Sequence, residues 1–332
     1  MMYKTLKVEA LKKLVFQVLL SAGETEENAG IIFENLLEDE YMNKPTHGFY
    51  RIPSIVEALK TRNAVLPVKI SQSNSIFSVD GQRNIGLVAV RKACDSIIAA
   101  SKEQPLVMAG IFNYISTTGA IGYYTRYLAR NGLISIMTCI SGATVVPHGG
   151  MDPLFGTNPI SVGIPYQDNP VITDVATAAI SYGQLALLAK AGTSVSPNTI
   201  LDKEGYPSTD PKDVTERGGT QLPLSGHKGY SLGLVFEILA GLLVGARSKN
   251  SASPDTDGAL LIAFKPDVFI ERNDFDHELD TFLMKIKNSR PAPGSDGIRI
   301  PGQYDTISYE KKKQSGEITI MDKVYEDIVS CL

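Results

Sequence analysis

The chain lacks several features that would each indicate a particular class of protein. Its three cysteines, Cys94, Cys139 and Cys331, lie far apart and form no CxxC pair, which excludes a disulfide framework and a zinc ribbon. Its formal net charge is −4, without the basic excess of a nucleic-acid-binding protein. None of its four histidines has another at i+4, so we expect no metal site.

Long apolar runs are missing as well. The longest, at 230–246, is interrupted by Glu237 and three glycines and falls short of the ~20 residues that a membrane span requires. We expect it to form a buried helix. The first 23 residues carry apolar side chains at helical spacing between lysines, which predicts an amphipathic core helix and no signal peptide. These patterns predict a cytoplasmic protein with neither a membrane nor a nucleic acid as partner.

Two widespread nucleotide-binding fingerprints are absent. No G-x-G-x-x-G follows a predicted strand, and no G-x-x-x-x-G-K-[ST] occurs anywhere. An S-x-x-K sequence does occur at 225–228, but the S-D-N and K-T-G motifs that accompany a serine acyl-transfer site do not. A Rossmann dinucleotide site, a P-loop and a serine acyl-transfer enzyme are therefore all disfavoured.

The patterns that are present predict a mixed α/β protein. Helical periodicity covers 8–22, 25–42 and 52–61, and from about residue 67 short strands alternate with helices. We expect a helical domain over 1–66 and a larger sheet domain over 67–304. The polar stretch 192–219 is expected to be surface loop, and the C-terminal region is expected to face solvent with a short helix near 321–329.

Three segments carry residues suited to chemistry. His47 and Arg51 lie four residues apart in a loop, where the imidazole could move a proton and the guanidinium could bind a carboxylate. Thr157 and Asn158 lie in a tight turn that could line a pocket. Lys228 lies at the start of a helix, where an anion or phosphate would be favoured. Each has a structural alternative: a core histidine, a plain turn, and a helix start with a solvated lysine.

The order of eight short motifs resembles the malate/L-lactate dehydrogenase family, which differs from the Rossmann lactate and malate dehydrogenases and includes sulfolactate and ureidoglycolate dehydrogenases. The motifs are T-H-G-x-x-R at 46–51, P-x-G-G at 147–150, G-T-N-P at 156–159, T-D at 173–174, S-Y-G at 181–183, D-x-x-G-x-x-[ST]-T-D-P at 202–211, P-L-x-G-x-K-G-Y at 223–230 and P-G at 301–302. Each is weak alone, but the full series spans nearly the whole chain.

The resemblance implies a fold, an activity and partners. The implied fold is a helical N-terminal part plus a large mixed-sheet cofactor domain, non-Rossmann and like that of L-sulfolactate dehydrogenase, with residues 305–332 packing on the helical part. The implied activity is interconversion of a small 2-hydroxy acid and its 2-keto acid by hydride transfer, with malate or lactate as the default substrate. The implied cofactor is NAD, with NADP left open, and the implied assembly is a homodimer.

The resemblance also implies roles for individual residues. His47 corresponds to the family's proton donor, and Arg51 to the arginine that faces the substrate carboxylate. Substrate contacts are expected from Thr157, Asn158, Thr117 and His148. Cofactor contacts are expected from three segments, which comprise Thr173, Asp174, Val175 and Ala176, then His227 and Lys228, and finally Gly302, Gln303 and Tyr304.

The chain departs from the usual family pattern at three positions. Thr117 occupies the place of a second active-site histidine, Ile140 that of an asparagine, and His148 that of an aromatic residue. His148 could partly replace the missing histidine or could merely fill the space of the aromatic ring. An alternative function is therefore a diverged member that binds NAD(P) but has weak or no dehydrogenase activity.

Overall fold

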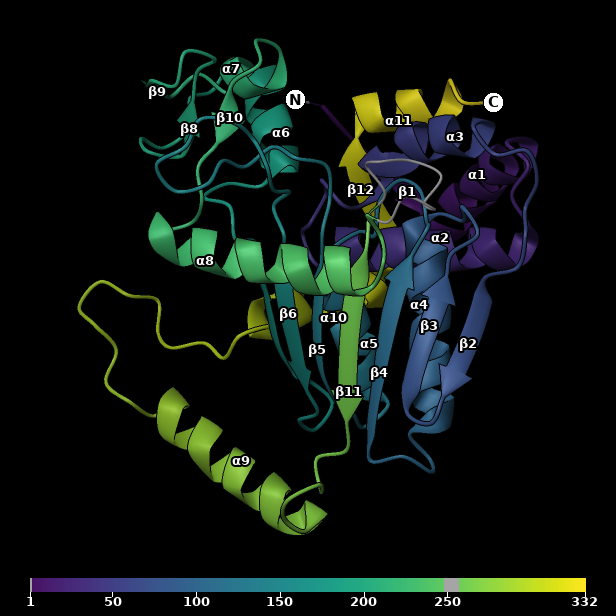
Figure 1. Cartoon of the computed structure of the whole chain (residues 1–332), viewed down its shortest axis with the longest axis vertical. Helices are drawn as coiled ribbons and strands as arrows, with labels where there is room; N and C mark the ends of the chain where they lie inside the picture. Colours follow the sequence, from purple (N-terminus) through teal and green to yellow (C-terminus); the bar gives the residue numbers. More distant parts are fainter. Residues whose placement is uncertain (1, 248–256) are drawn as a thin grey trace.

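A seven-stranded mixed sheet forms the centre of the larger part of the molecule (Figure 1). The computed structural model describes residues 2–247 and 257–332. The strand order is β2-β3-β4-β11-β5-β6-β7, in which only β3 and β4 pair in parallel. The strands are β2 (Lys69–Ser73), β3 (Ile76–Asp80), β4 (Leu106–Phe112), β5 (Ile134–Cys139), β6 (Ile160–Ile164), β7 (Val171–Val175) and β11 (Ala259–Phe264).

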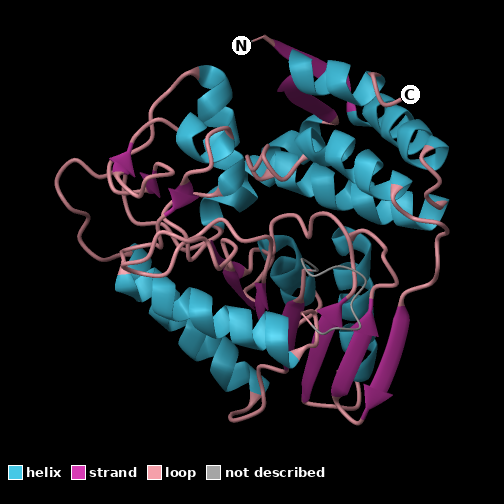
Figure 2. Cartoon of the chain, turned by 45° about the horizontal axis from the view of Figure 1, so that its top comes forward, coloured by secondary structure: helices cyan, strands magenta, loops and turns pink. Residues whose placement is uncertain are grey.

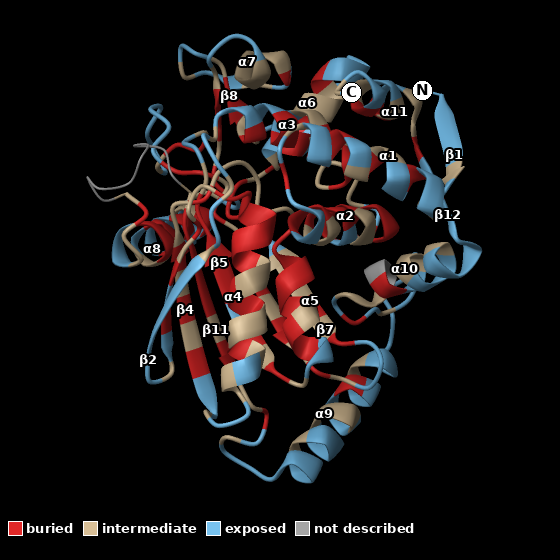
Figure 3. Ribbon diagram, turned by 90° about the vertical axis from the view of Figure 1, so that its right-hand side faces the viewer, coloured by how far each residue is buried: buried red, intermediate tan, exposed pale blue. Residues whose placement is uncertain are grey.

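Helices cover both faces of this sheet (Figure 3). On one face lie α4 (Gly86–Ala100) and α5 (Gly122–Arg130), whose buried side chains share a core with alternate residues of the strands. In β4, for example, Val107, Ala109 and Ile111 are buried in that core, as the period of two in a strand requires. The opposite face is crossed by α8 (His227–Phe236) and the π-helix η2 (Glu237–Leu243).

The expectation of a fully buried helix over 230–246 is wrong. Several large apolar side chains of α8 and η2 are exposed in this chain, namely Leu232, Leu234, Val235, Ile238, Leu242 and Leu243. A helix on the outside of a sheet can bury only the stripe that contacts the strands, here represented by Gly233, Phe236, Ala240 and Gly241. The apolar side chains on the outer side of α8 and η2 therefore lie on the surface of the chain and not in its core.

The helical part combines residues from both ends of the chain (Figure 2). It contains α1 (Val8–Ser21), α2 (Glu26–Tyr41), the 3₁₀-helix η1 (Phe49–Arg51), α3 (Ile52–Lys60) and α11 (Asp322–Val329). The Thr25 hydroxyl accepts from Asn28 N and caps α2. Strand β1 (Tyr3–Lys7) pairs antiparallel with β12 (Glu317–Met321), both of which the sequence analysis missed.

The C-terminal region does not simply face solvent. Ile318, Ile320, Val324 and Ile328 are buried in one core with α1, α2 and α3. The preceding helix α10 (Gln303–Ser315) carries Lys312, which donates to the carbonyl oxygen of Glu40. The boundary between a 1–66 domain and a 67–304 domain remains a prediction.

The stretch 192–219 is a small folded unit and not a loop. It contains α7 (Lys212–Thr215) and two strands that form a three-stranded sheet with β10 (Thr220–Gln221), namely β8 (Ile200–Leu201) and β9 (Pro207–Ser208). Val195 and Ile200 pack with Leu185 of α6 (Tyr182–Ala191). Short strands of two residues leave no periodicity in the sequence, which explains why they were missed.

Helix α9 (Arg272–Lys287) extends away from the sheet, and of its side chains only Leu283 is buried (Figure 1). Among the described residues no helix has the length and apolarity to cross a membrane.

Candidate active site

His47 lies in a short loop between α2 and η1 that contacts several elements. Arg51 Nε donates to the carbonyl oxygen of Thr46 at 2.7 Å, which closes the loop, and the Thr46 hydroxyl lies 3.1 Å from His47 Nδ1. Thr46 also packs directly on Gly183, where a Cβ atom would lie 2.8 Å from Thr46 Cβ. The glycine of the S-Y-G motif is therefore required because the His47 loop occupies the space of a side chain.

The buried carboxyl group of Glu40, in α2, contacts the same loop. Glu40 Oε1 accepts from the backbone N–H of Phe49 at 3.1 Å, and the Glu40 side chain fills the place of a side chain at Gly48. Burial raises the pKa of Glu40 to about 7, although the hydrogen bond from Phe49 and the charge of Lys312 act in the opposite direction. Glu40 thus explains the glycine in the T-H-G motif.

Two adjacent cavities meet at His47. The first has a volume of about 410 Å³ and is bordered by His47, Arg51, Thr117, Ile140 and Thr157, among others. The second, of about 380 Å³, is bordered by Lys44, Asp174, Ala176 and Gln184. His47, Gly119, Thr157, Pro159 and Ser181 border both. The arrangement can hold two molecules side by side, with the imidazole at their junction.

The environment of His47 favours its neutral form. Burial, together with the charges of Arg51 and Lys44, lowers the pKa of His47 to about 4, although the charge of Asp174 acts in the opposite direction. At neutral pH the imidazole is therefore uncharged and able to accept a proton. Cys139, which borders the first cavity, is no competing nucleophile, because burial raises its pKa to about 12 and keeps the thiol protonated.

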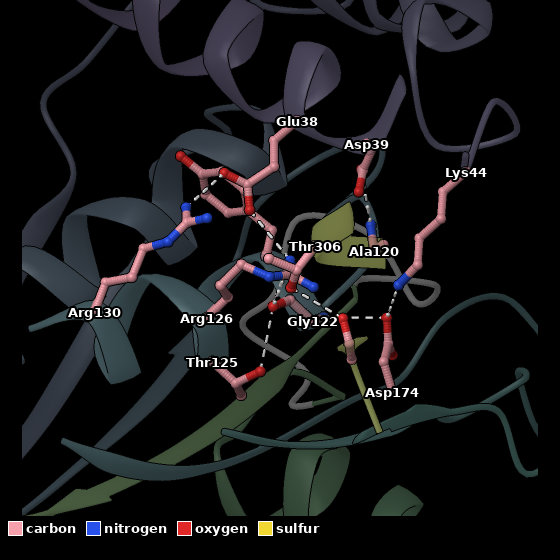
Figure 4. Close-up of polar contacts among 12 residues, drawn as sticks. Glu38, Asp39, Lys44, Ala120, Gly122, Thr125, Arg126, Arg130, Asp174 and Thr306 are labelled. Carbon is pink, nitrogen blue, oxygen red and sulfur yellow. Dashed lines mark hydrogen bonds and ion pairs between the residues drawn. The ribbon is translucent and has the colours of Figure 1, made fainter. Parts of the chain in front are cut away.

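Two carboxyl groups and one lysine meet at the start of α5 (Figure 4). Asp174 Oδ2 accepts from Gly122 N at 3.2 Å and from Lys44 Nζ at 3.0 Å. Asp39, which is buried, accepts from Ala120 N at 3.4 Å. Burial raises the pKa of Asp39 well above its usual range, and the charge of Lys44 acts against this. The Lys44–Asp174 ion pair thus joins the His47 loop to β7 and to the first turn of α5.

The structure brings together some of the residues expected to bind substrate. Thr117 borders the first cavity, and its hydroxyl accepts from Gly119 N at 2.9 Å, so its own proton remains for donation. Thr157 borders both cavities. Asn158 is fully buried instead, and its amide donates to the Gly233 carbonyl and to Glu237. Asn158 therefore attaches α8 to the G-T-N-P turn.

Other expected site residues lie elsewhere. His148 borders neither cavity and faces the exposed start of α8, where its ring lies 6.2 Å from that of His227. His227 and Lys228 are both exposed there. In the expected cofactor segment 173–176, Asp174 and Ala176 border the second cavity. Val175 is exposed instead, and the carbonyl oxygen of Thr173 accepts from the Ser161 hydroxyl.

The third expected cofactor segment contacts β7 from outside these cavities. Gly302, at φ +85°, approaches Ile172 so closely that a Cβ atom would lie 3.0 Å from its backbone nitrogen. Gln303 borders a separate hollow with Pro170 and Ile300, and Tyr304 follows it in the first turn of α10. The cofactor roles of these residues stay predictions.

Sequence reasoning missed Lys44, Asp39 and Glu40 as parts of the site. All three are ionisable residues close to the T-H-G-x-x-R motif, but such residues on a helix or loop are usually solvated. No spacing in the sequence indicated that Asp39 and Glu40 are buried and that Lys44 is half-buried. Ser181 and Gly183 belong to the S-Y-G motif, which was noted without a role.

Comparison with known proteins adds to this geometry. The sequence profile described as malate/L-lactate dehydrogenase matches residues 6–329. The chain belongs to the malate/L-lactate dehydrogenase family. It is 31% identical over 318 residues to the malate/(S)-sulfolactate dehydrogenase of Methanothermus fervidus, covering 93% of this chain and 91% of that protein. It is 28% identical to the ureidoglycolate dehydrogenase (NAD(+)) of Escherichia coli K12, covering 97% and 94%.

A solved structure agrees with these comparisons. Sulfolactate dehydrogenase from Methanocaldococcus jannaschii superposes with a TM-score of 0.86 at 30% identity, covering 99% of this chain and 96% of that one. The predicted family and the predicted mixed α/β fold, like that of sulfolactate dehydrogenase, are confirmed. As a malate/L-lactate dehydrogenase family member, the chain is an oxidoreductase of small 2-hydroxy acids that uses a nicotinamide cofactor.

Proposed function

We propose that the chain reduces a small 2-keto acid to its 2-hydroxy acid, and catalyses the reverse reaction, with the reacting carbon beside His47. The observation that carries this proposal is that His47 borders both cavities, whereas Arg51 borders only the first. An arginine fork binds a carboxylate, which assigns the first cavity to the acid and leaves the second for the nicotinamide ring.

The residues of the second cavity fit such a ring. Small or hydroxyl-bearing side chains, Ala176, Ser181 and Thr157, border it and could contact a flat ring and its carboxamide. The bound nicotinamide would supply or accept the hydride. The preferred form is proposed to be NAD, with NADP as the alternative, and the more remote contacts are proposed for His227, Lys228 and the segment from Gly302 to Tyr304.

His47 moves the proton in this proposal. In the oxidative direction the neutral imidazole accepts the proton of the 2-hydroxyl group, and in the reductive direction the imidazolium returns it. The lowered pKa of His47 keeps its imidazole in the neutral, proton-accepting form at neutral pH. During reduction the keto oxygen gains negative charge, which makes it a stronger base than the imidazole, so the proton moves to the oxygen. Thr117 donates a hydrogen bond to the same oxygen but shuttles no proton.

We further propose a cytoplasmic homodimer. The exposed apolar side chains of α8 and η2 form a continuous helical face, which on a water-exposed monomer would be unfavourable. A second copy of the chain would cover it. Malate and lactate remain the default substrates, and the division into domains at residue 67 and the packing of residues 305–332 on the helical domain form part of the same proposal.

A substrate panel tests the proposed function. Pyruvate, oxaloacetate, 2-ketoglutarate and sulfopyruvate are each offered with NADH and with NADPH, and cofactor oxidation is followed by the loss of the absorbance of the reduced nicotinamide. Turnover of at least one keto acid supports the proposal. Tight NADH binding without any turnover would instead favour the alternative of a diverged, inactive member. A chelator is included, and we expect it to leave NADH binding unchanged, since none of the described residues form a metal-binding group.

A further inference from the structure

The ion pair between Lys44 and Asp174 has no role in the steps described above. Lys44 lies in the same loop as His47, three residues earlier, and Asp174 lies at the end of β7. The two side chains are 3.0 Å apart and only partly exposed, at 24% and 16%. Both border the second cavity together with His47. The pair therefore lies between the helical part, the sheet and the junction of the two cavities (Figure 4).

Asp174 is attached on the sheet side by more than its strand. Its Oδ2 accepts from Gly122 N as well as from Lys44, so it is held at the start of α5, where carboxylates are favoured. The carboxylate lies close against α5, since a Cβ atom on Gly122 would lie 2.9 Å from the same oxygen. Because Asp174 is held by α5, its ion pair with Lys44 holds the loop that carries both Lys44 and His47.

Charged groups from the loop itself and from β7 act on the imidazole of His47. Arg51 and Lys44 present positive charge to His47, and Asp174 presents negative charge. Asp39, from α2, also interacts with the charge of Lys44, and burial raises the pKa of the Asp39 carboxyl group well above its usual range. Arg51 is assigned to the substrate carboxylate. Lys44 and Asp174 then place one positive and one negative charge near the imidazole. Their effects on a proton at His47 are opposite in direction.

We propose that Lys44 and Asp174 are positioning residues that hold the His47 loop on β7 and balance the electrostatic field at its imidazole. This inference rests on the proposed role of His47, yet it concerns a property of the free protein that can be measured without turnover. The pair acts through His47 and needs no contact with substrate.

The proposal predicts opposite effects of two single substitutions. Lys44→Met removes a cation and leaves Asp174, so the pH at which His47 takes up its proton rises by roughly 0.5–1 unit. Asp174→Asn removes the anion but keeps an oxygen that can accept from Gly122 N, so the same midpoint falls. The double variant returns towards the native midpoint, and Lys44→Arg retains it.

The measurement is an NMR titration of the histidine Cε1–H signals in the full-length protein without substrate. The chain has only four histidines, and His47→Gln identifies the signal of interest. A matched control is the exposed pair Lys323–Asp327, also 3.0 Å apart, whose substitution to Met and Asn is expected to leave the His47 midpoint unchanged.

The outcomes are separable. Shifts of opposite sign for Lys44→Met and Asp174→Asn support the proposal, whatever the substrate panel gives. Shifts of the same sign, or none, overturn it even when the enzyme turns over a keto acid. If Asp174→Asn does not fold, Lys44→Met alone decides, because an unchanged midpoint in that variant would remove Lys44 from the field at His47.

Discussion

Two histidine sites in this chain look alike in sequence but differ in structure. His47 lies in a loop held by Arg51, Glu40 and Gly183, at the junction of two cavities. His148 and His227 lie at the open start of α8, where their rings contact each other and where both are exposed. Both sites belong to family motifs with a histidine beside a cation. The comparison indicates that the packing around a histidine, more than the motif it belongs to, decides whether its imidazole is suited to proton transfer.

Replacing His47 gives the largest expected effect. His47→Gln should lower kcat by about 10²–10⁴-fold, the usual contribution of a general acid or base, while NADH affinity changes little. Steady-state kinetics on the best keto acid and a titration of NADH fluorescence measure the two quantities. A variant with near-native kcat would show that His47 has no part in the mechanism. The two histidine sites would then not differ in catalytic role.

Changing Arg51 tests the carboxylate site. Arg51→Lys should raise KM by about 10–100-fold, because hydrogen bonds to a charged group contribute ~1.5–3 kcal/mol and an ammonium group lacks the fork. The variant also loses the bond from Arg51 Nε to the Thr46 carbonyl, so kcat falls as well. Arg272→Lys, on the surface of α9, provides a control of the same chemistry. An unchanged KM would assign the carboxylate to another residue.

Glu40 provides a test of stability. In the unfolded chain this carboxyl group ionises near its usual value, whereas in the folded protein its pKa is about 7. The folded state therefore binds more protons between these values, and stability falls as the pH rises through that window. Glu40→Gln keeps an acceptor for Phe49 N without the charge, so the variant should unfold at higher urea concentration than the native protein above pH 7.

The control for that experiment is Glu57→Gln, which removes a carboxylate from an exposed ion pair with Lys60. Its urea midpoint should shift little at any pH. His47 acts in the other direction, since its lowered pKa costs stability as the pH falls from its usual value towards 4. Equal pH dependence of native protein and Glu40→Gln would show that the Glu40 carboxyl ionises freely in the fold.

The smallest effect is expected at His148. His148→Phe should change kcat by less than about twofold, because surface substitutions away from the site are usually near neutral and His148 borders neither cavity. The competing idea is that His148 compensates for Thr117. In that case His148→Phe would cut kcat substantially, and adding Thr117→His would restore much of it.

The sequence predicted those parts of the fold that have their own periodicity. The predicted helices at 8–22, 25–42 and 52–61 agree with the observed α1, α2 and α3 within a residue at each end. Strands β1 and β12 were missed, because each is stabilised by a partner more than three hundred residues away. No local pattern encodes such a pairing. The outer face of α8 was misjudged because composition alone cannot say which side of a helix meets the sheet.

The site was predicted where a motif carries its own chemistry and missed where chemistry depends on packing. The pairing of His47 with Arg51 follows from their spacing in one loop. Asn158 was assigned to substrate because an amide in a turn can bind a ligand, but the amide instead donates to Gly233 and Glu237 from α8 and η2. The ion pair of Lys44 with Asp174 joins residues 130 positions apart, which only the folded chain brings together.

The mixed origin of the helical core has a consequence for the order of folding. Helices α1, α2 and α3 comprise most of the first sixty residues, yet the core beneath them also needs Ile318, Ile320, Val324 and Ile328. During synthesis part of the apolar side of these helices stays uncovered until residues 318–328 have been translated and can pack on it. Contacts of such long sequence separation are slow to form. The loop that carries His47 lies beside Phe49 and Ile52 of this shared core, so by this logic it becomes rigid only after the distant strand and helix have joined the core.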